Sequence, residues 1–197
     1  MTAKKIIDDH IQKNGHITIY DYMDIALADP QHGYYTTRYP IGKDGDFTTA
    51  PEVSQLFGEM LAIYIIDHWF KIGQPKTLKV IEFGPGRGTL MYDVLRTISG
   101  VLPALMDVLT ITLVETSQTL TTQQREKLAP YQNVNWVSSI DDIDTNGDVF
   151  YMGNEFFDAL PIHQYEQKNG TWHERVITRK NGDYTFDTIA RDTHPIP

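Results

Sequence analysis

Three glycines stand at alternate positions in the stretch VIEFGPGRGTL, residues 80–90, where an apolar run meets a helix-like run. The residues before the glycines predict a strand and those after them a helix. Such a junction directs free backbone N–H groups and the positive end of a helix dipole toward the carboxyl edge of a parallel sheet. Gly84, Gly86 and Gly88 allow the tight turn and leave space for a ligand against the backbone. The pattern predicts a ligand site, and the alternative is a turn whose glycines serve its conformation alone.

The residues around the glycines separate the classes of ligand. A phosphate-binding loop needs Lys followed by Ser or Thr, and this loop has no Lys. A dinucleotide-binding loop places its last glycine one position later, where this chain has Thr89. Glu82, at the end of the expected strand, would repel a pyrophosphate and attract the sulfonium and ammonium groups of S-adenosylmethionine. We therefore predict S-adenosylmethionine as cofactor, on the E-x-G-x-G-x-G pattern of class I methyltransferases. For Glu82 the alternative is a solvated carboxylate at a strand end.

Acidic residues follow the next two expected strands. Glu115 ends the second strand, where its carboxylate can accept hydrogen bonds from both ribose hydroxyls of a nucleoside. Asp141 and Asp142 come after the third strand, where the adenine edge would lie. The alternative for this pair is an N-cap of a short helical turn.

The stretch GNEFFDALP follows the fourth expected strand, at the position where a class I enzyme meets its methyl acceptor. Asn154 and Glu155 place polar groups at this sheet edge, and we interpret Glu155 as functional. For Phe156 and Phe157 we expect packing in the core, and for Leu160 core packing is the alternative to a role at the acceptor.

The elements that must position these residues alternate between strand and helix. Expected strands are LKVIEF, LTITLVE, VNWVS and DVFYMGNE; expected helices are residues 4–14, 19–29, 52–73, 89–98 and 117–130. Alternation of this kind produces parallel strands joined by crossover helices. After Pro161, two KNG turns flanked by strand-like segments predict an antiparallel meander.

The predicted fold is therefore α/β: a Rossmann-like sheet of the class I S-adenosylmethionine-dependent methyltransferase type, with N-terminal helices and a C-terminal antiparallel meander. We expect three parts. Residues 1–74 form a helical and loop segment that caps the donor site, residues 75–161 the cofactor-binding core, and residues 162–197 the meander and tail.

Composition excludes several function classes. A net charge of −9 over 197 residues, without a basic run, argues against nucleic-acid binding. The chain has no cysteine, and its seven histidines never take the H-x-x-x-H spacing, so we expect no metal site. No apolar segment approaches the ~20 residues of a membrane helix. The first residues show neither a secretory signal nor an organellar presequence, from which we expect a cytoplasmic protein.

Five blocks together resemble the MidA-like methyltransferases: YMDIALADPQHGYY, GDFTTAPEVSQLFGE, EFGPGRGTLMYDVLR, LVETSQTLTTQQREKL and NEFFDALPIHQYE. The mitochondrial members of this family act as a protein arginine methyltransferase in assembly of respiratory complex I. The resemblance implies S-adenosylmethionine as methyl donor and arginine on a partner protein as acceptor, a respiratory complex subunit being one candidate. It does not indicate an oligomeric state.

The resemblance also implies roles for residues. Glu82, the three loop glycines and Glu115 would hold the donor, joined by Gly45 and Asp46 from the loop GDFTTAPE. Asn154 and Glu155 would face the acceptor. We hypothesise that Glu155, alone or with Asp46, pairs with the acceptor guanidinium.

Family members are nearly twice as long as this chain, and their second half, with a D-Y-G block not found here, supplies further strands. The chain therefore resembles an N-terminal portion, with an incomplete sheet. Two other functions stay open. One is a nicotinamide-dependent oxidoreductase of similar architecture; the other is a non-enzymatic assembly module that binds S-adenosylmethionine, or a truncated inactive fragment.

Overall fold

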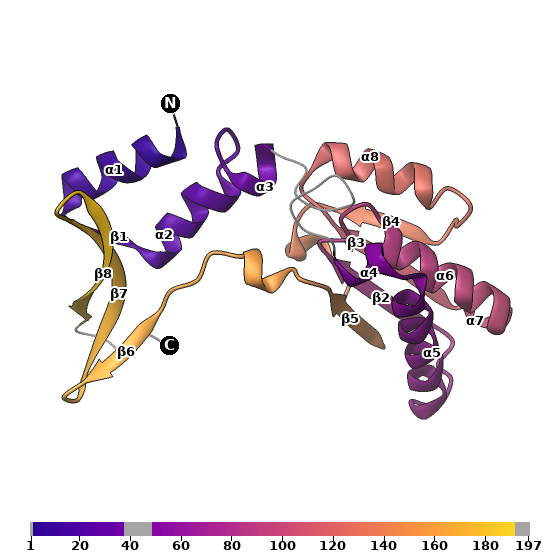
Figure 1. Ribbon diagram of the computed structural model, residues 1–197. Helices are drawn as coiled ribbons and strands as arrows, with labels where there is room; N and C mark the ends of the chain where they lie inside the picture. The colour runs from indigo at the N-terminus through magenta and orange to yellow at the C-terminus, as the bar shows by residue number, and fades with distance from the viewer. Residues whose placement is uncertain (1, 38–48, 192–197) are drawn as a thin grey trace. The chain divides into compact units, whose positions relative to one another are not determined.

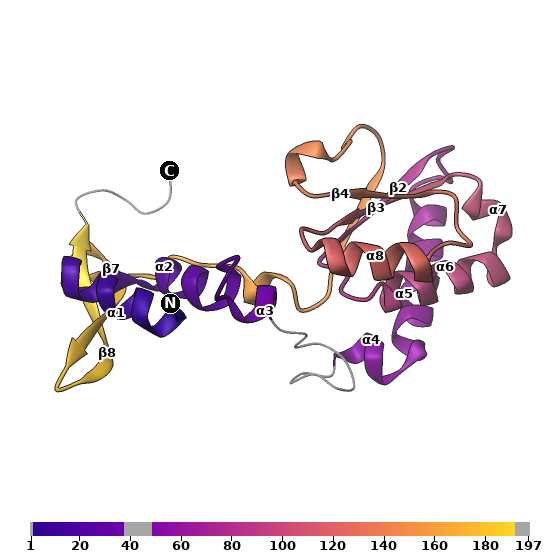
Figure 2. The ribbon, with the colours of Figure 1, turned by 90° about the horizontal axis from the view of Figure 1, so that it is seen from above.

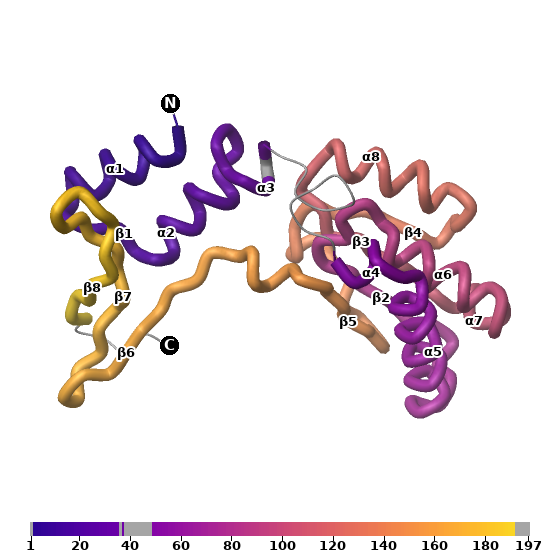
Figure 3. The backbone as a smooth tube through the Cα atoms, in the orientation of Figure 1, coloured from indigo at the N-terminus to yellow at the C-terminus, as the bar shows by residue number. Residues whose placement is uncertain are grey.

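The computed structural model describes residues 2–37 and 49–191, and the chain forms two compact units. One unit, Ile41–Phe157, contains the glycine-rich junction; the other joins the two ends of the chain, Met1–Pro40 and Asp158–Pro197. Figure 3 traces the backbone through both units. The boundaries predicted at residues 74 and 161 remain a prediction of domain organisation.

The unit Ile41–Phe157 is built on a parallel sheet, as predicted. Its strands lie in the order β4-β3-β2-β5, and every pairing is parallel (Figure 1). Their bounds are β2 (Leu78–Phe83), β3 (Leu109–Val114), β4 (Val134–Val137) and β5 (Val149–Gly153). Because β2 lies between β3 and β5, the carboxyl end of β2 is central in the sheet, which is where ligands bind in open α/β sheets.

Helices flank this sheet, and α5, α6 and α8 lie on one side of it (Figure 2). The helical elements of the unit are α4 (Ala50–Val53), α5 (Gln55–Lys71), α6 (Thr89–Val101), α7 (Pro103–Met106), α8 (Gln118–Lys127) and the 3₁₀ turn η2 (Ile140–Asp142). The single helix expected over residues 52–73 is broken at Ser54, whose backbone is extended at φ −153°. Its hydroxyl accepts the Leu56 N–H at 3.2 Å and so caps α5.

The main core fills the space between the sheet and these helices. Alternate residues of the central strands point toward the helices, among them Val80 and Ile111, which are at most 1% exposed. Ile65 of α5 and Met91 of α6 meet them from the helical side. Burial of each such side chain contributes ~1.5–3 kcal/mol, so the junction between β2 and α6 rests on a well-packed base.

The other unit contains the predicted meander. Its elements are α1 (Ala3–Asn14), β1 (Ile17–Thr18), α2 (Ile19–Met23), the π-helix η1 (Asp24–Ala28), α3 (Tyr34–Thr37), β6 (Tyr165–Lys168), β7 (Thr171–Lys180) and β8 (Asp183–Arg191). The 3₁₀ turn η3 (Phe157–Ala159) spans the boundary between the units. Lys168 pairs with Thr171 and Lys180 with Asp183, so both KNG segments form the two-residue turns expected of them.

A contact between the ends of the chain completes this unit. β1 adds to the meander beside β7, with Ile17 opposite Ile177 and Thr18 opposite Val176. Ile7 and Ile11 of α1 pack on the same cluster. Sequence analysis missed β1, because a two-residue strand has no period to detect. Within the described ranges, no helix is long and apolar enough to cross a membrane.

Candidate donor-binding site

The glycine-rich junction forms a tight turn directly after β2. Gly84 and Gly86 have φ of +60° and +55°, which favours glycine over any residue with a side chain. The Gly84 N–H donates to the Val114 carbonyl at 3.1 Å, and the Gly88 N–H donates to the Pro85 carbonyl at 2.8 Å. Thr89 then begins α6. The sequence thus predicted this junction correctly, residue by residue.

The space around the glycines differs from one to the next. A Cβ at Gly84 would collide with the ring of Phe156, so this glycine is required by packing. A Cβ at Gly86 would meet no atom within 4 Å of the described structure. Gly86 therefore has the open surroundings that a ligand needs to approach the backbone.

Glu82 is buried at the end of β2, between Leu113 of β3 and Met152 of β5. The residue is 2% exposed, and within the part of the chain that the structure describes its Oε2 has no hydrogen-bond partner. Burial raises the pKa of Glu82 to about 8. The alternative of a solvated carboxylate is therefore wrong. A buried carboxylate without a partner is costly, and a cationic group beside it would offset that cost. This environment fits the cationic methionine end of S-adenosylmethionine.

Glu115 lies just beyond the end of β3, half-buried. Its Oε1 accepts the Ser117 N–H at 2.8 Å, and its Oε2 accepts the Gln124 amide at 3.2 Å. Burial raises the pKa of Glu115, and the hydrogen bonds from Ser117 and Gln124 oppose this shift. The two contacts fix the plane of the carboxylate at the same sheet edge as the glycine turn.

Gln124 of α8 connects these parts and was missed by sequence analysis. Its side chain is fully buried and donates to the Gly86 carbonyl at 2.7 Å. Its Oε1 accepts the Trp136 indole N–H at 3.0 Å. The sequence does contain a signal for Gln124. It lies four residues after Leu120 and four before Leu128, so a polar residue interrupts the apolar stripe of α8.

Thr89, the first residue of α6, is held by two charged side chains. Its hydroxyl donates to Glu52 of α4 at 2.7 Å and accepts from Lys127 of α8 at 2.6 Å. These bonds attach α4 and α8 to the helix that begins at the glycine turn. Sequence analysis assigned no role to either charged residue.

The remaining residues predicted to contact the donor are Asp141, with its neighbour Asp142, and the pair Gly45 and Asp46. Asp141 is exposed in η2, and its N–H donates to the Ser139 hydroxyl at 3.2 Å. Ser139 is thus the N-cap, and the alternative of an N-cap formed by Asp141 and Asp142 is wrong. Gly45 and Asp46 lie outside the described residues. Contacts of Asp141 with adenine stay a prediction.

The segment after β5 carries the expected acceptor residues. Asn154 is half-buried and Glu155 exposed, with the unusual φ of +49° for Glu155. Phe156 packs against Phe83 with ring centroids 5.8 Å apart, but Phe157 is 64% exposed. Core packing of Phe157 was therefore a wrong expectation, because in the described structure β5 is the edge strand and no further strand pairs beside it. Leu160, for which core packing was the alternative, is 39% exposed.

Comparison with known proteins places the chain in a family. The family described as "Putative S-adenosyl-L-methionine-dependent methyltransferase" matches residues 60–196. The chain belongs to this methyltransferase family. The predicted resemblance and the predicted cofactor class are thereby confirmed.

Relatives of this family member carry more specific names. A Xenopus laevis protein named "Protein arginine methyltransferase NDUFAF7, mitochondrial" is 38% identical over 190 residues, which cover 85% of this chain and 43% of the relative. The Homo sapiens protein of the same name is 35% identical over 189 residues, with the same coverage. The chain spans less than half the length of these curated relatives. The expected cytoplasmic location is contradicted, because the relatives are named mitochondrial. That expectation rested on the first residues of a chain that matches only part of its relatives, and such residues do not reveal location.

A solved structure supports the fold of this family member. The crystal structure of a COG1565 superfamily member from Burkholderia thailandensis, bound to S-adenosyl-homocysteine, superposes with a TM-score of 0.75 at 27% identity. The superposition covers 98% of this chain and 50% of the Burkholderia chain. The predicted α/β class I methyltransferase fold is confirmed.

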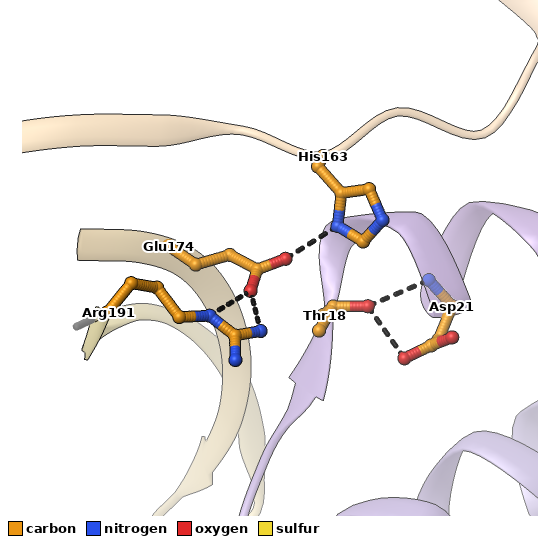
Figure 4. Close-up of polar contacts among 5 residues, drawn as sticks. All are labelled: Thr18, Asp21, His163, Glu174 and Arg191. Atoms are coloured by element: carbon orange, nitrogen blue, oxygen red, sulfur yellow. Dashed lines mark hydrogen bonds and ion pairs between the residues drawn. The ribbon is translucent and has the colours of Figure 1, made fainter. Parts of the chain in front are cut away.

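The unit formed by the chain ends contains a separate cluster of polar side chains, away from the glycine turn in sequence. Glu174 of β7 is fully buried, yet its carboxylate contacts two side chains (Figure 4). One oxygen lies 2.6 Å from Nδ1 of His163, and the other accepts from Nε of Arg191 at 2.7 Å and from its Nη2. Nearby, the Thr18 hydroxyl caps α2 by accepting the Asp21 N–H (Figure 4). Sequence analysis missed this cluster, because its charged residues come from segments 11 to 28 residues apart.

Proposed function

We propose that this chain forms the donor-binding part of an S-adenosylmethionine-dependent methyltransferase that modifies arginine on a partner protein. The observation that carries the proposal is the buried Glu82 at the end of β2, next to the glycine turn, whose Oε2 has no hydrogen-bond partner among the residues that the structure describes. A pyrophosphate ligand would place negative charge beside this carboxylate, whereas a sulfonium and an ammonium would be attracted to it. The names of the relatives, which are protein arginine methyltransferases, support the acceptor class.

Each part of the donor has a proposed partner. Glu82 would hold the cationic methionine end, and the open surroundings of Gly86 would admit the ligand to the backbone of the turn. Glu115 would accept the ribose hydroxyls, and Asp141 would lie at the adenine edge. Gly45 and Asp46 would add contacts from their loop. When bound, the donor supplies a methyl group activated by its sulfonium.

For the acceptor, we propose that Glu155 orients an arginine side chain, with Asn154 beside it and Asp46 as a second carboxylate. A guanidinium is protonated at neutral pH and is a poor nucleophile, so it has to be held with one nitrogen in line for attack. A carboxylate that binds the guanidinium through its other nitrogens fixes the plane and concentrates electron density on the attacking nitrogen. Family resemblance makes a respiratory complex subunit one candidate partner.

The test compares ligands and variants by titration calorimetry. We expect wild-type protein to bind S-adenosylmethionine and S-adenosylhomocysteine and not to bind nicotinamide dinucleotides. Glu82→Gln should weaken donor binding, while Glu126→Gln, an exposed change on α8, should not. Binding of a dinucleotide in preference to the donor would contradict the proposal.

A second candidate function follows from length, because the chain covers 43% of the Xenopus relative. A binding module that retains the donor site without turnover would bind the donor as above. Incubation with methyl-labelled donor and a mixture of mitochondrial proteins separates the two functions. Label on arginine supports the enzyme, and donor binding without label transfer supports the module.

A further inference from the structure

Both polar atoms of the Gln124 side chain are hydrogen-bonded, and its amide nitrogen binds two groups of the candidate donor site. From α8, its amide nitrogen reaches the Gly86 carbonyl at 2.7 Å and Glu115 Oε2 at 3.2 Å, and its amide oxygen accepts from Trp136 at 3.0 Å. Its side chain is fully buried, so water does not substitute for any of these bonds.

The chemistry of the three partners determines the orientation of the amide. An indole N–H only donates, while a carbonyl and a carboxylate oxygen only accept. The Gln124 oxygen must therefore face Trp136, and its nitrogen must face Gly86 and Glu115. A flipped amide would place oxygen against two acceptors and nitrogen against a donor. Trp136 is itself covered by Arg125, whose guanidinium lies 4.3 Å from the ring centroid, so the indole that sets this orientation is packed on its face.

We propose that Gln124 is the positioning residue that holds Glu115 for the donor ribose and couples it to the glycine turn. This inference rests on the proposed function. With Ser117 N–H on Oε1 and Gln124 on Oε2, and with the Thr116 N–H also bonded to the carboxylate, Glu115 has one fixed plane and keeps accepting capacity for a ribose hydroxyl. Because the same amide nitrogen binds Gly86, a displacement of the turn and a rotation of Glu115 are linked through one side chain.

Neither glutamate nor methionine, the residues closest in shape to glutamine, satisfies all three contacts. Glutamate at position 124 would place a carboxylate against Glu115 and the Gly86 carbonyl, where only its protonated form avoids repulsion. Methionine matches the length and volume of Gln124 but has no N–H to offer. Gln124→Met therefore removes the hydrogen bonds with little change in packing.

The test measures ribose recognition rather than stability alone. Calorimetry gives the dissociation constants of S-adenosylhomocysteine and of its 2′-deoxy analogue, and their ratio reports the hydrogen bond to the 2′-hydroxyl. For wild-type protein we expect a ratio of about ten, as for one hydrogen bond to a carboxylate. For Gln124→Met we expect the ratio to fall to about two or below. The matched control is Gln118→Met, the same change at an exposed position of the same helix, which should keep the wild-type ratio.

The outcomes distinguish the two proposals. A wild-type ratio in folded Gln124→Met protein overturns the positioning role, even where the overall affinity drops. If Gln124→Met does not fold, the ratio is read on Gln124→Asn, whose amide is one methylene too short for all three partners, with the same criterion. Wild-type protein that binds neither ligand overturns the proposed function as well, whereas wild-type binding with unchanged variant ratios overturns only the role of Gln124.

Discussion

The ring of Phe156 lies where a side chain at Gly84 would have to be: a Cβ added at Gly84 would stand 3.2 Å from ring carbon Cε2 and closer still to Cδ2. Phe156 directly follows Asn154 and Glu155, the residues proposed to face the acceptor. The turn expected to hold the donor and the segment expected to hold the acceptor are thus in contact, within one compact unit. A change at either place should affect the other.

Alanine at Gly84 and at Gly86 should therefore have different effects. Both changes impose a left-handed backbone on a residue with a side chain, at about 1 kcal/mol each. Gly84→Ala must also displace Phe156, so its free energy of unfolding should fall further than that of Gly86→Ala. Urea unfolding of both variants measures this difference, and equal losses would show that Phe156 moves aside freely.

Valine at Gly86 should weaken donor binding more than it weakens folding. The branched side chain would occupy open space that the described protein atoms leave beside the turn. We expect calorimetry to show loss of measurable S-adenosylhomocysteine binding while the circular dichroism spectrum is retained. Unchanged affinity would remove Gly86 from the donor site.

Glu82 should release a proton when the donor binds. With its pKa raised to about 8 by burial, the free protein holds this carboxyl protonated at pH 7. A bound cation favours the carboxylate and lowers that pKa, so binding at pH 7 expels up to one proton. Calorimetry in buffers of different ionisation enthalpy measures this proton. Glu82→Gln should release none from this position, and wild-type binding without proton release would contradict the cationic pairing.

The same group should make the ligand-free protein less stable as pH rises. An unperturbed glutamate has a pKa of 4.5, whereas burial raises the pKa of Glu82 in the fold to about 8. Folding therefore favours the protonated form of this side chain. This contribution is fully present below pH 4.5 and is lost as pH rises toward 8. Between pH 5 and 8, the melting temperature of the wild type should decline relative to that of Glu82→Gln. Parallel curves would show that Glu82 is not protonated in the fold.

Replacing the Glu155 carboxylate should affect turnover and leave the donor in place. Glu155 is exposed, so Glu155→Gln should fold normally and bind S-adenosylhomocysteine with wild-type affinity. If it orients the acceptor, methyl transfer to arginine should fall by on the order of 10²-fold. Label transfer at the wild-type rate would end the role assigned to this residue.

Glu174→Gln should destabilise the unit formed by the chain ends. The change leaves Arg191 and His163 without their shared carboxylate, but both side chains are about half-exposed and regain water. We therefore expect a loss of about 2 kcal/mol, below the range for a fully buried pair. The control is Glu166→Gln, which breaks an exposed ion pair between Glu166 and Lys168 within β6, the strand beside β7. This change should not measurably alter the free energy of unfolding. Equal unfolding midpoints for the two variants would contradict a structural role for Glu174.

Several features of this protein follow from consecutive residues. The run LKVIEF and the glycines after it predicted β2 and its turn to the residue, because period-two patterning and positive φ are set by side chains a few positions apart. The two Asn-Gly turns predicted the meander in the same way: both asparagines take φ above +50°, which suits the two-residue hairpin. The role of Glu82 was predicted from its negative charge and its position. An acid at a strand end beside a glycine turn favours a cationic ligand over a pyrophosphate.

The tertiary structure alone decided which distant residues share an environment. Sequence left open whether Glu82 is solvated, and burial by strands β3 and β5 settled it. Gln124 stands 38 positions from Gly86, and its role depends on how α8 packs beside the turn. β1 pairs with β7 across some 160 residues. Local patterns encode the elements because neighbours along the chain determine backbone preference, whereas burial and hydrogen-bond partners arise only when separate elements pack together.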